Sequence, residues 1–345
     1  MSHKTLLLLT VDTEASLAGL RPLAAEPMVW GRVGGGTWGI ERIMDCCEAR
    51  GMRATFFVST LEALHHGDDH VRRMCAAVVG RGHDAQLHVH PIWLDDANAR
   101  KAITDFGPDG PPLAVELGAA IFRRTCDAEL VAHRAGGLWL DTGTLRVVEA
   151  LGIPMDASVA VGYHDYDLGV APPNVPRRLG GLVEGPVTTF RQMRLGPWSL
   201  RRNFDINADS LAELRYVVSR AAAEGVAAVT LLMHSFSFIG RNGDSTAFWP
   251  EPGEVHKFEA FLDWVAARED IEAVTFRELA ERLEAEPWLL DGPDFAPTAG
   301  VLRTYGRSWA RFHTGWKSKA FALGLPLAAA GLAALVVASI WWLVR

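Results

Sequence analysis

Near the start of the chain stands Leu6-Leu-Leu-Leu-Thr-Val-Asp-Thr-Glu14, an apolar run that is followed at once by two acidic residues. A short, wholly apolar run is typical of a parallel strand that is buried on both faces of its sheet. Because side chains alternate along a strand with a period of two, Thr10, Asp12 and Glu14 are predicted to share one face. The stretch therefore predicts a buried strand that carries carboxylates at its carboxyl end.

A second stretch, Asp84-Ala-Gln-Leu-His-Val-His90, alternates polar and apolar residues and ends in two imidazoles. Two histidines at positions i and i+2 of a strand point to the same side and can bind one metal ion. A carboxylate from a neighbouring strand, Asp12 or Glu14, would complete a ligand set that leaves a position open for water, which suits hydrolysis. The alternative is that His88 and His90 only bond backbone at the end of a strand.

Two further polar clusters contain residues with catalytic potential. One is His133-Arg-Ala-Gly-Gly137, and the other is Met233-His-Ser-Phe-Ser237, at the end of the apolar run 228–233. In parallel α/β folds the carboxyl ends of the strands carry the chemistry, so Arg134 and His234 are candidate functional residues. Each has a structural alternative: Arg134 as one half of a buried ion pair, and His234 as a histidine at the end of a core strand.

Strand-like and helical patterns alternate along most of the chain. The strand-like segments are 5–11, 53–58, 84–90, 131–135, 154–160 and 228–233, and the helical patterns between them include 40–50, 143–151 and 209–224. This alternation predicts parallel βα units in either an open sheet or a barrel. Stretches rich in Pro and Gly, 105–112 and 170–186, are expected to be loops that leave this framework on the substrate side.

In their order along the chain, the polar clusters resemble the motifs of the polysaccharide deacetylase family, the NodB-homology carbohydrate esterases. The matching segments are Thr10-Val-Asp-Thr-Glu14 (first motif), Gly51–Val58 (second strand), Gly82–His88 (approach to the metal motif), His133–Gly136 (arginine motif), Met155–Ser158 (Asp-Ser segment) and Leu232-Met-His234 (acid histidine). The resemblance covers roughly residues 5–285 and implies the family's α/β fold, a distorted (β/α)7 barrel.

The resemblance also implies an activity and a role for each residue. It implies a hydrolase that removes an N-acyl group, acetyl or formyl, from a sugar with a divalent metal ion, for which Zn is expected and Ni, Co or Mn are alternatives. Asp12 would be the catalytic base, Arg134 would orient or neutralise it, and His234 would protonate the leaving amine. Asp156 would orient His234; the alternative for Asp156 is an aspartate at a strand end or turn.

Two positions differ from the family pattern. Thr13 stands where a second Asp usually binds the metal, and Ile92 stands where the second ligand histidine is usual. Glu14 and His90 are interpreted as their replacements, so that Glu14, His88 and His90 are the candidate metal ligands. Two alternatives stay open: a metal-free hydrolase of C–N bonds, as in the allantoinase-like branch of the superfamily, and an inactive, membrane-tethered glycan-binding protein.

Composition limits the classes of partner. The formal charge is −7 and the isoelectric point is about 5.9, so no basic surface for nucleic acid is expected, and nucleic acid should be a poor partner. The four cysteines, Cys46, Cys47, Cys75 and Cys126, show no Cys-x-x-Cys or disulfide-framework spacing, so reduced and mostly buried thiols are expected.

The composition changes near residue 286. Residues 1–286 are interpreted as the catalytic domain and 287–319 as a linker that is rich in Pro and Gly and then basic and aromatic. No charge occurs in 320–344, which is long enough as a helix to span a hydrocarbon core of about 30 Å. This segment is therefore predicted to be a transmembrane helix.

The charges around this segment predict a topology. Basic residues crowd the side that precedes it and only Arg345 follows it, so the positive-inside rule predicts a cytoplasmic catalytic domain. No secretory signal is recognisable near the first residues. The chain is expected to be a tail-anchored, single-pass membrane protein whose partners are the lipid bilayer and an N-acylated sugar of a lipid-linked or nascent envelope glycan.

Overall fold

The computed structural model describes residues 3–15, 26–95, 106–195, 198–243, 245–300, 303 and 323–324. The chain falls into two compact units, one formed by Met1–Phe190 and Arg202–Pro297 and the other by Arg191–Arg201 and Thr298–Arg345. The first unit contains every residue that the sequence marks as a candidate for catalysis or metal binding.

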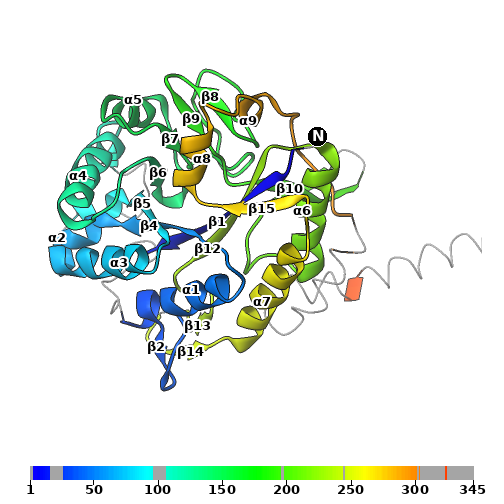
Figure 1. The fold of residues 1–345 in the computed structure, drawn as a ribbon. Coiled ribbons are helices and arrows are strands. Elements are labelled where there is room, and N and C mark those ends of the chain that lie inside the picture. The colour runs from blue at the N-terminus through cyan, green and yellow to red at the C-terminus, as the bar shows by residue number, and fades with distance from the viewer. Residues whose placement is uncertain are drawn as a thin grey trace, which may run out of the picture. The chain divides into compact units, whose positions relative to one another are not determined.

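A curled sheet forms the centre of the first unit (Figure 1). Seven parallel strands follow one another in the order β12 (Ala228–His234), β1 (Thr5–Thr13), β4 (Thr55–Ser59), β5 (Asp84–Val89), β6 (Ala132–Ala135), β7 (Met155–Asp156) and β9 (Leu182–Glu184). The antiparallel strand β8 (Arg177–Leu179) follows β9, and β15 (Ile271–Val274) pairs in parallel with the first half of β1. The alternation of strands and helices predicted from the sequence is confirmed.

Helices lie around the outside of this sheet (Figure 1). They are α1 (Ile40–Glu48), α2 (Ala63–His66), α3 (Asp68–Gly80), α4 (Gly110–Thr125), α5 (Thr142–Ala150), α6 (Leu211–Glu224), α7 (Pro252–Ala266), α8 (Phe276–Arg282) and α9 (Trp288–Asp291), with single turns η1 (Glu26–Trp30), η2 (Thr60–Glu62), η3 (Pro91–Leu94) and η5 (Gly136–Leu138). Helix α6 is capped at both ends: Ser210 and Glu213 form a capping box that begins it, and Gly225 ends it in the left-handed conformation.

Irregular backbone joins the two edges of the curled sheet. After β9, the amide of Gly185 donates to the Asp156 carbonyl at 2.7 Å, and the amide of Val187 donates to the Val159 carbonyl at 2.8 Å. The next residue, Thr188, donates to the Thr230 carbonyl of β12 at 3.2 Å. The prediction that 170–186 is only a loop was therefore wrong, because β8 and β9 lie within it. Their three residues each are too short to show a strand pattern between Gly and Pro.

The side chains around the first half of β1 form an apolar core inside the curled sheet. All nine residues of β1 are buried, as the run of leucines predicts. Leu6 and Leu8 pack with Phe57, Met155 and Ala157 in one core cluster. Each fully buried leucine of this kind contributes about 1.5–3 kcal/mol relative to an exposed one, so β1 is the central apolar element of the unit.

The described residues also form two-stranded ribbons that are separate from the main sheet. They are β2 (Arg32–Val33) with β3 (Gly36–Thr37), and β13 (Ile239–Arg241) with β14 (Phe248–Pro250). A third hairpin is formed by β10 (Thr189–Leu195) and β11 (Trp198–Asn203). In the second unit, Ala299 N donates to Arg191 O at 2.8 Å and Gly300 N to Gln192 O at 3.0 Å, so residues 299–300 lie beside this hairpin.

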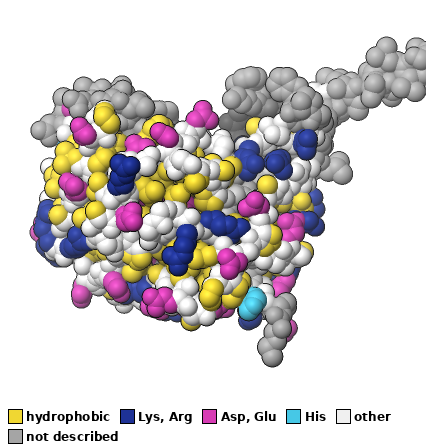
Figure 2. All heavy atoms as spheres, turned by 90° about the horizontal axis from the view of Figure 1, so that it is seen from above, with side chains coloured by type: hydrophobic (Ala, Val, Ile, Leu, Met, Phe, Trp, Pro, Cys, Tyr) yellow, Lys and Arg dark blue, Asp and Glu magenta, His cyan; other side chains and the backbone are white. Residues whose placement is uncertain are grey.

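Charged side chains of both signs are scattered over the face of the molecule in Figure 2, between larger areas of apolar and other atoms. No helix in the described part of the chain is long and apolar enough to cross a membrane. The predicted transmembrane segment 320–344 lies outside that part, apart from residues 323 and 324, and so does most of the predicted linker after residue 300.

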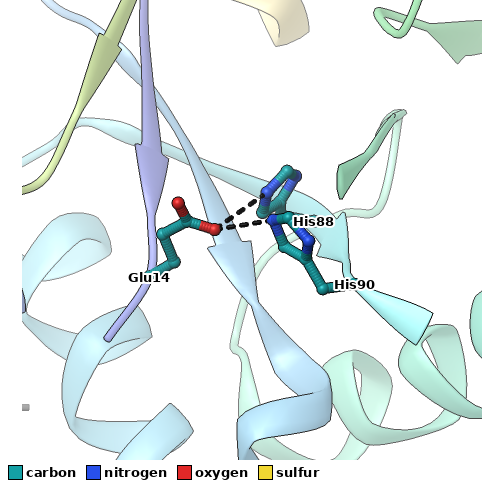
Figure 3. Close-up of side chains that lie close together, drawn as sticks. All are labelled: Glu14, His88 and His90. Carbon is teal, nitrogen blue, oxygen red and sulfur yellow. Dashed lines mark ion pairs between the residues drawn. The ribbon is translucent and has the colours of Figure 1, made fainter. Parts of the chain in front are cut away.

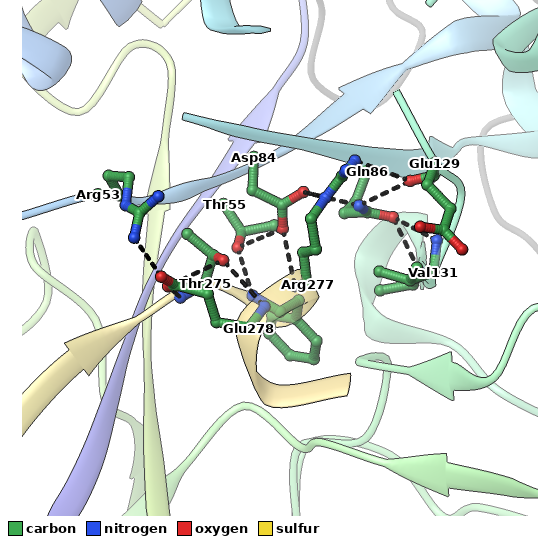
Figure 4. Close-up of polar contacts among 11 residues, drawn as sticks. Arg53, Thr55, Asp84, Gln86, Glu129, Val131, Thr275, Arg277 and Glu278 are labelled. Carbon is green, nitrogen blue, oxygen red and sulfur yellow. Dashed lines mark hydrogen bonds and ion pairs between the residues drawn. The ribbon is translucent and has the colours of Figure 1, made fainter. Parts of the chain in front are cut away.

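A buried polar network ties the amino-terminal ends of the strands together (Figure 4). The Gln86 carbonyl oxygen accepts from the amides of Val131 and Ala132 at 2.9 and 2.8 Å, and its amide group donates to Asp84 at 2.7 Å. Asp84 also accepts from Thr55, whose hydroxyl accepts the amide of Phe276 at the start of α8. The network thus fixes β6 and α8 to β4 and β5.

We expect Gln86→Leu to lower the free energy of unfolding by about 2–4 kcal/mol, because the buried amides of Val131 and Ala132 lose their acceptor. Arg53→Ala is the control within the same network: Arg53 pairs with Glu278 but its side chain is 56% exposed, so the loss should stay below about 1 kcal/mol. Urea unfolding followed by circular dichroism measures both. Equal losses of stability in the two variants would contradict the conclusion that the buried contacts of Gln86 hold this network together.

Candidate active site

Three candidate ligands gather at the carboxyl ends of β1 and β5 (Figure 3). Glu14 directly follows β1, His88 lies in β5 and His90 directly follows it. Glu14 Oε2 lies 2.7 Å from Nε2 of His90 and 3.5 Å from Nε2 of His88, and one ligand atom of each residue lies within 4.8 Å of the others. Among the described residues, this is the group with the spacing of a metal site. The structure therefore brings together the three residues that the sequence marks as ligands.

The orientation of His88 suits a metal ligand. Its Nδ1 donates to the backbone carbonyl of Arg134 at 2.9 Å, which leaves the lone pair on Nε2. Nε2 is buried and has no hydrogen-bond partner, although it faces Glu14. A second hydrogen bond that fixes the tautomer and the ring plane is the usual arrangement of a metal-binding histidine.

His90 occupies space that only a glycine at position 136 leaves open. A Cβ atom placed on Gly136 would lie 2.3 Å from Cγ and Nδ1 of the His90 ring. Any other residue there would push the ring away from Glu14. The sequence motif contains this glycine, but the contact was not predicted from the sequence because it joins β5 to the turn after β6.

Ser235 fixes the backbone from which the Glu14 side chain projects. Its hydroxyl accepts the amide of Glu14 at 3.3 Å and donates to the Glu14 carbonyl at 3.1 Å, while the next amide, that of Ala15, donates to Glu62 at 2.7 Å. Thr13 is buried and its hydroxyl contacts the carbonyl of Val11, so it lies outside the ligand group. Glu14 is the acidic residue that reaches the histidines from this strand.

The environment of Glu14 and His88 favours a positive charge between them. Burial alone would raise the pKa of Glu14, but His90 and His88 outweigh it and hold this pKa far below its ordinary value. Burial lowers the pKa of His88, whereas Asp12 and Glu14 raise it, with a net increase. A site that attracts protons onto its imidazoles in this way also attracts a cation, and the donor set of two imidazoles and a carboxylate fits Zn²⁺ or a similar divalent ion.

Asp12 and Arg134 form an ion pair inside the sheet. Nη1 of Arg134 donates to Asp12 Oδ1 at 2.7 Å and to the Thr10 hydroxyl at 3.0 Å, and Nε donates to the Ala157 carbonyl at 3.1 Å. The guanidinium carbon lies 4.1 Å from the ring centroid of Phe57. Thr10 and Asp12 thus face the same side, as the period of two predicts. Arg134 is a buried ion-pair partner, and it is also the residue that contacts the candidate base.

The pKa of Asp12 lies below its ordinary value. Burial would raise it, but the positive charge of Arg134, followed by His88 and His234, lowers it by more. The carboxylate is therefore ionised at neutral pH and can accept a proton, although it is only 5% exposed.

His234 lies beside Asp12 at the end of β12. The two residues are register partners on neighbouring parallel strands, so their side chains point to the same side. The ring of His234 stacks on that of Phe236, with 4.9 Å between centroids and 29° between planes. His234 is partly exposed, unlike Asp12, and can exchange protons with a bound molecule. Phe236 was not singled out in the sequence, where nothing separates it from other loop aromatics.

The partner expected for Asp156 was His234, and here the structure requires a correction. Met155 and Ala157 pack in the interior cluster, so Asp156 between them points to the opposite face of the sheet. There it lies 2.6 Å from Nδ1 of His133, its register partner on β6. The sequence could not show which histidine lies on the neighbouring strand.

A buried acid pair completes this outer cluster. Glu184 of β9 is the register partner of Asp156 and accepts the amide of Val159 at 3.0 Å, and burial together with the Asp156 carboxylate raises the pKa of Glu184 well above its ordinary value. Of the two acids, Glu184 therefore binds a proton more readily than Asp156. This cluster of His133, Asp156 and Glu184 lies on the helix side of the sheet and supports the strands, away from the candidate ligands.

No protein-family model matches the sequence, and no curated protein matches it significantly. Several solved structures, however, superpose on it. A protein of Mycobacterium smegmatis described as a polysaccharide deacetylase superposes with a TM-score of 0.56 at 17% identity, covering 86% of this chain and 94% of that one. The chain has the fold of the polysaccharide deacetylases. The predicted resemblance to the NodB-homology family is confirmed at the level of the fold.

The same fold includes an allantoinase, named PuuE, which superposes with a TM-score of 0.50 at 15% identity and covers 82% of this chain and 91% of that one. Both matches span nearly the whole length of the solved chains. At these identities the comparison concerns the fold alone.

We expect the purified protein to hold about one divalent metal ion per chain and His88→Ala to lose it, because His88 supplies the unpartnered Nε2. Gly136→Ala should weaken the binding by displacing His90. His256→Ala and Gly253→Ala are the controls, since His256 is exposed on α7 and a Cβ on Gly253 would meet nothing within 4 Å. Elemental analysis after dialysis against Zn²⁺ measures the content. A full equivalent retained by His88→Ala would contradict the site.

Proposed function

We propose that this protein is a metal-dependent hydrolase that removes an N-acyl group, acetyl or formyl, from a sugar. The observation that supports this most strongly is that two groups of residues lie close together at the carboxyl ends of the strands. One is the ligand group Glu14, His88 and His90, and the other is the ionised Asp12 with its ion-pair partner Arg134. A candidate base beside a three-ligand site is what hydrolysis of an unactivated amide needs.

Glu14, His88 and His90 would hold the metal ion, with Zn²⁺ preferred and Ni²⁺, Co²⁺ or Mn²⁺ as alternatives. Two histidines and one carboxylate leave a coordination position open. When bound, such an ion polarises the acyl carbonyl and lowers the pKa of water. The remaining chemistry is the work of side chains on β1, β6 and β12.

Asp12 is the general base in this proposal. It is ionised because Arg134 lowers its pKa, and Arg134 also keeps the carboxylate in one orientation through the 2.7 Å hydrogen bond. The proton that Asp12 takes from water leaves a nucleophile for the acyl carbon. The Arg134 ion pair therefore has both a structural and a catalytic consequence.

His234 is the general acid. Its place beside Asp12 allows it to donate a proton to the amine that leaves the acyl carbon. Stacking on Phe236 limits rotation of the imidazole and keeps it next to the base. The partial exposure of His234 is suited to a group that must meet the substrate.

A metal-free hydrolase of C–N bonds is the second candidate. The allantoinase fold match and the two departures, Thr13 and Ile92, favour it. An inactive glycan-binding protein is the third candidate. The ion pair of Asp12 with Arg134 and the adjacent His234 weigh against it, because a protein that only binds a glycan does not need a buried carboxylate and guanidinium at this place. Metal content separates the first candidate from the second, and turnover separates both from the third.

The substrate we favour is a lipid-linked or nascent envelope glycan that is processed at the cytoplasmic face of a membrane. This rests on the uncharged segment 320–344 and the basic residues before it. The bilayer is then a partner of the chain, and the catalytic domain meets its substrate at the lipid surface.

Asp12→Asn and His234→Gln should each lower the deacylation rate by about 10²–10⁴-fold while the metal content stays unchanged, because neither residue is a ligand. Release of acetate or formate from N-acylated sugar oligomers and from lipid-linked sugars measures the rate, with His256→Gln as the surface control. Unchanged turnover in Asp12→Asn would refute its role as the base.

We expect the full chain to stay with membranes after extraction with alkaline carbonate, because an inserted apolar helix is not released by charge or pH. Replacing Leu332 and Leu335 in segment 320–344 by Arg should release it into the soluble fraction, whereas exchanging the same residues for Ile should not. A full chain that is released by carbonate would contradict the predicted span.

A further inference from the structure

We propose that Arg241 binds an anionic group of the substrate, a phosphate or a carboxylate on the sugar, at the edge of the active site. The inference rests on the proposed function, because it names the class of substrate that the same site takes. It is carried by the position of the Arg241 side chain and by the partners that this side chain lacks.

Arg241 belongs to the layer of side chains that ends at the candidate acid. It is the last residue of β13, and its guanidinium carbon lies 5.1 Å from the ring centroid of Phe236. The same ring stacks on His234 at 4.9 Å. A guanidinium, a phenyl ring and an imidazole are thus packed in series, which places the charge of Arg241 one ring away from the leaving-group side of the site.

Arg241 also interacts electrostatically with the ligand group, through Glu14. Burial lowers the pKa of Arg241, and the carboxylate of Glu14 is near enough to raise it in part. Glu14 itself is turned to His88 and His90, however, and the structure gives no ion pair between Glu14 and Arg241 among the described residues. The guanidinium is therefore near the site but not neutralised by it.

Nη1 of Arg241 is buried and has no hydrogen-bond partner. Other arginines of the first unit also have one buried nitrogen without a partner, but they differ in their remaining contacts: Arg134 pairs with Asp12 and Arg42 with Glu259, whereas Arg241 has no ion pair among the described residues. Leaving a buried charged donor without an acceptor is costly, and such groups are normally satisfied by a partner or a ligand. A guanidinium presents its donors in a planar fork that matches phosphate and carboxylate oxygens. An anion bound at this position would satisfy Nη1.

The negative net charge of the chain means that an anionic ligand needs a local cation to bind. The chain carries a formal charge of −7, so its long-range field repels anionic sugars. Preference for an anionic over a neutral sugar must then come from a local cation. The charge of Arg134 is paired with Asp12, whereas Arg241, which packs on the ring beside His234, has no carboxylate partner among the described residues.

The test measures binding of three probes to the full chain by calorimetry: N-acetylglucosamine 1-phosphate, N-acetylmuramic acid and neutral N-acetylglucosamine. We expect at least one anionic probe to bind about tenfold or more tightly than the neutral one, as one charge-assisted contact allows. Phosphate and carboxylate are separated by which of the two probes gains. Arg241→Met should abolish the difference and leave the neutral probe unchanged, and Arg241→Lys should keep part of it.

Arg268→Met is the matched control, because Arg268 also packs 5.1 Å from an aromatic centroid, that of Trp264, but is paired with Asp270 away from the site. Unfolding provides a second readout. Removing a half-buried guanidinium whose Nη1 has no partner should leave Arg241→Met at least as stable as the parent, whereas an arginine that only supports the hairpin would lower stability when removed.

Equal binding of all three probes to the parent chain, no binding of either anionic probe, or an unchanged preference in Arg241→Met would each overturn the proposal. These outcomes are independent of turnover. Arg241-dependent binding without deacylation would refute the proposed function and keep the anion site, whereas deacylation without an anion preference would do the reverse.

Discussion

The ion pair between Arg134 and Asp12 is the interaction on which the site depends. It joins β6 to β1 across the interior of the sheet, over the ring of Phe57. The same short segment acts twice more: the Arg134 carbonyl orients His88, and Gly136 leaves room for His90. The candidate base and two candidate ligands are therefore positioned by the stretch 134–136, so a shift of β6 would disturb all of them together.

Local periodicity explains which parts of the site could be predicted from the sequence. Thr10, Asp12 and Glu14 share a face, and so do His88 and His90, because alternation along a strand requires only neighbouring residues. The partner of Asp156 depends on which strands pair and which face each side chain takes, and it was predicted wrongly. Gly136 and Phe236 act through contacts between distant segments, which no spacing reveals, and β8 and β9 are too short to show a pattern.

Strand β5 shows how one element separates stability from chemistry. Asp84 and Gln86 lie near its amino end and bind β4, β6 and α8, whereas His88 near its carboxyl end faces Glu14. All three side chains belong to one polar stripe in the sequence. The alternation in the sequence does not show which of these side chains support the fold and which face the candidate ligands. That depends on where the neighbouring parallel strands end.

The charges of the site fit an anionic reacting group. Asp12 and Glu14 contribute two negative charges, and Arg134 and Arg241 contribute two positive ones, so these side chains sum to zero. A divalent ion held by Glu14, His88 and His90 would leave the site with net positive charge in a largely buried setting, where electrostatic interactions are strong. Hydrolysis of an amide develops negative charge on the acyl oxygen. The two arginines differ in their partners: Arg134 is paired with the candidate base Asp12, whereas Arg241 has no ion pair among the described residues and, in our proposal, binds an anionic group of the substrate.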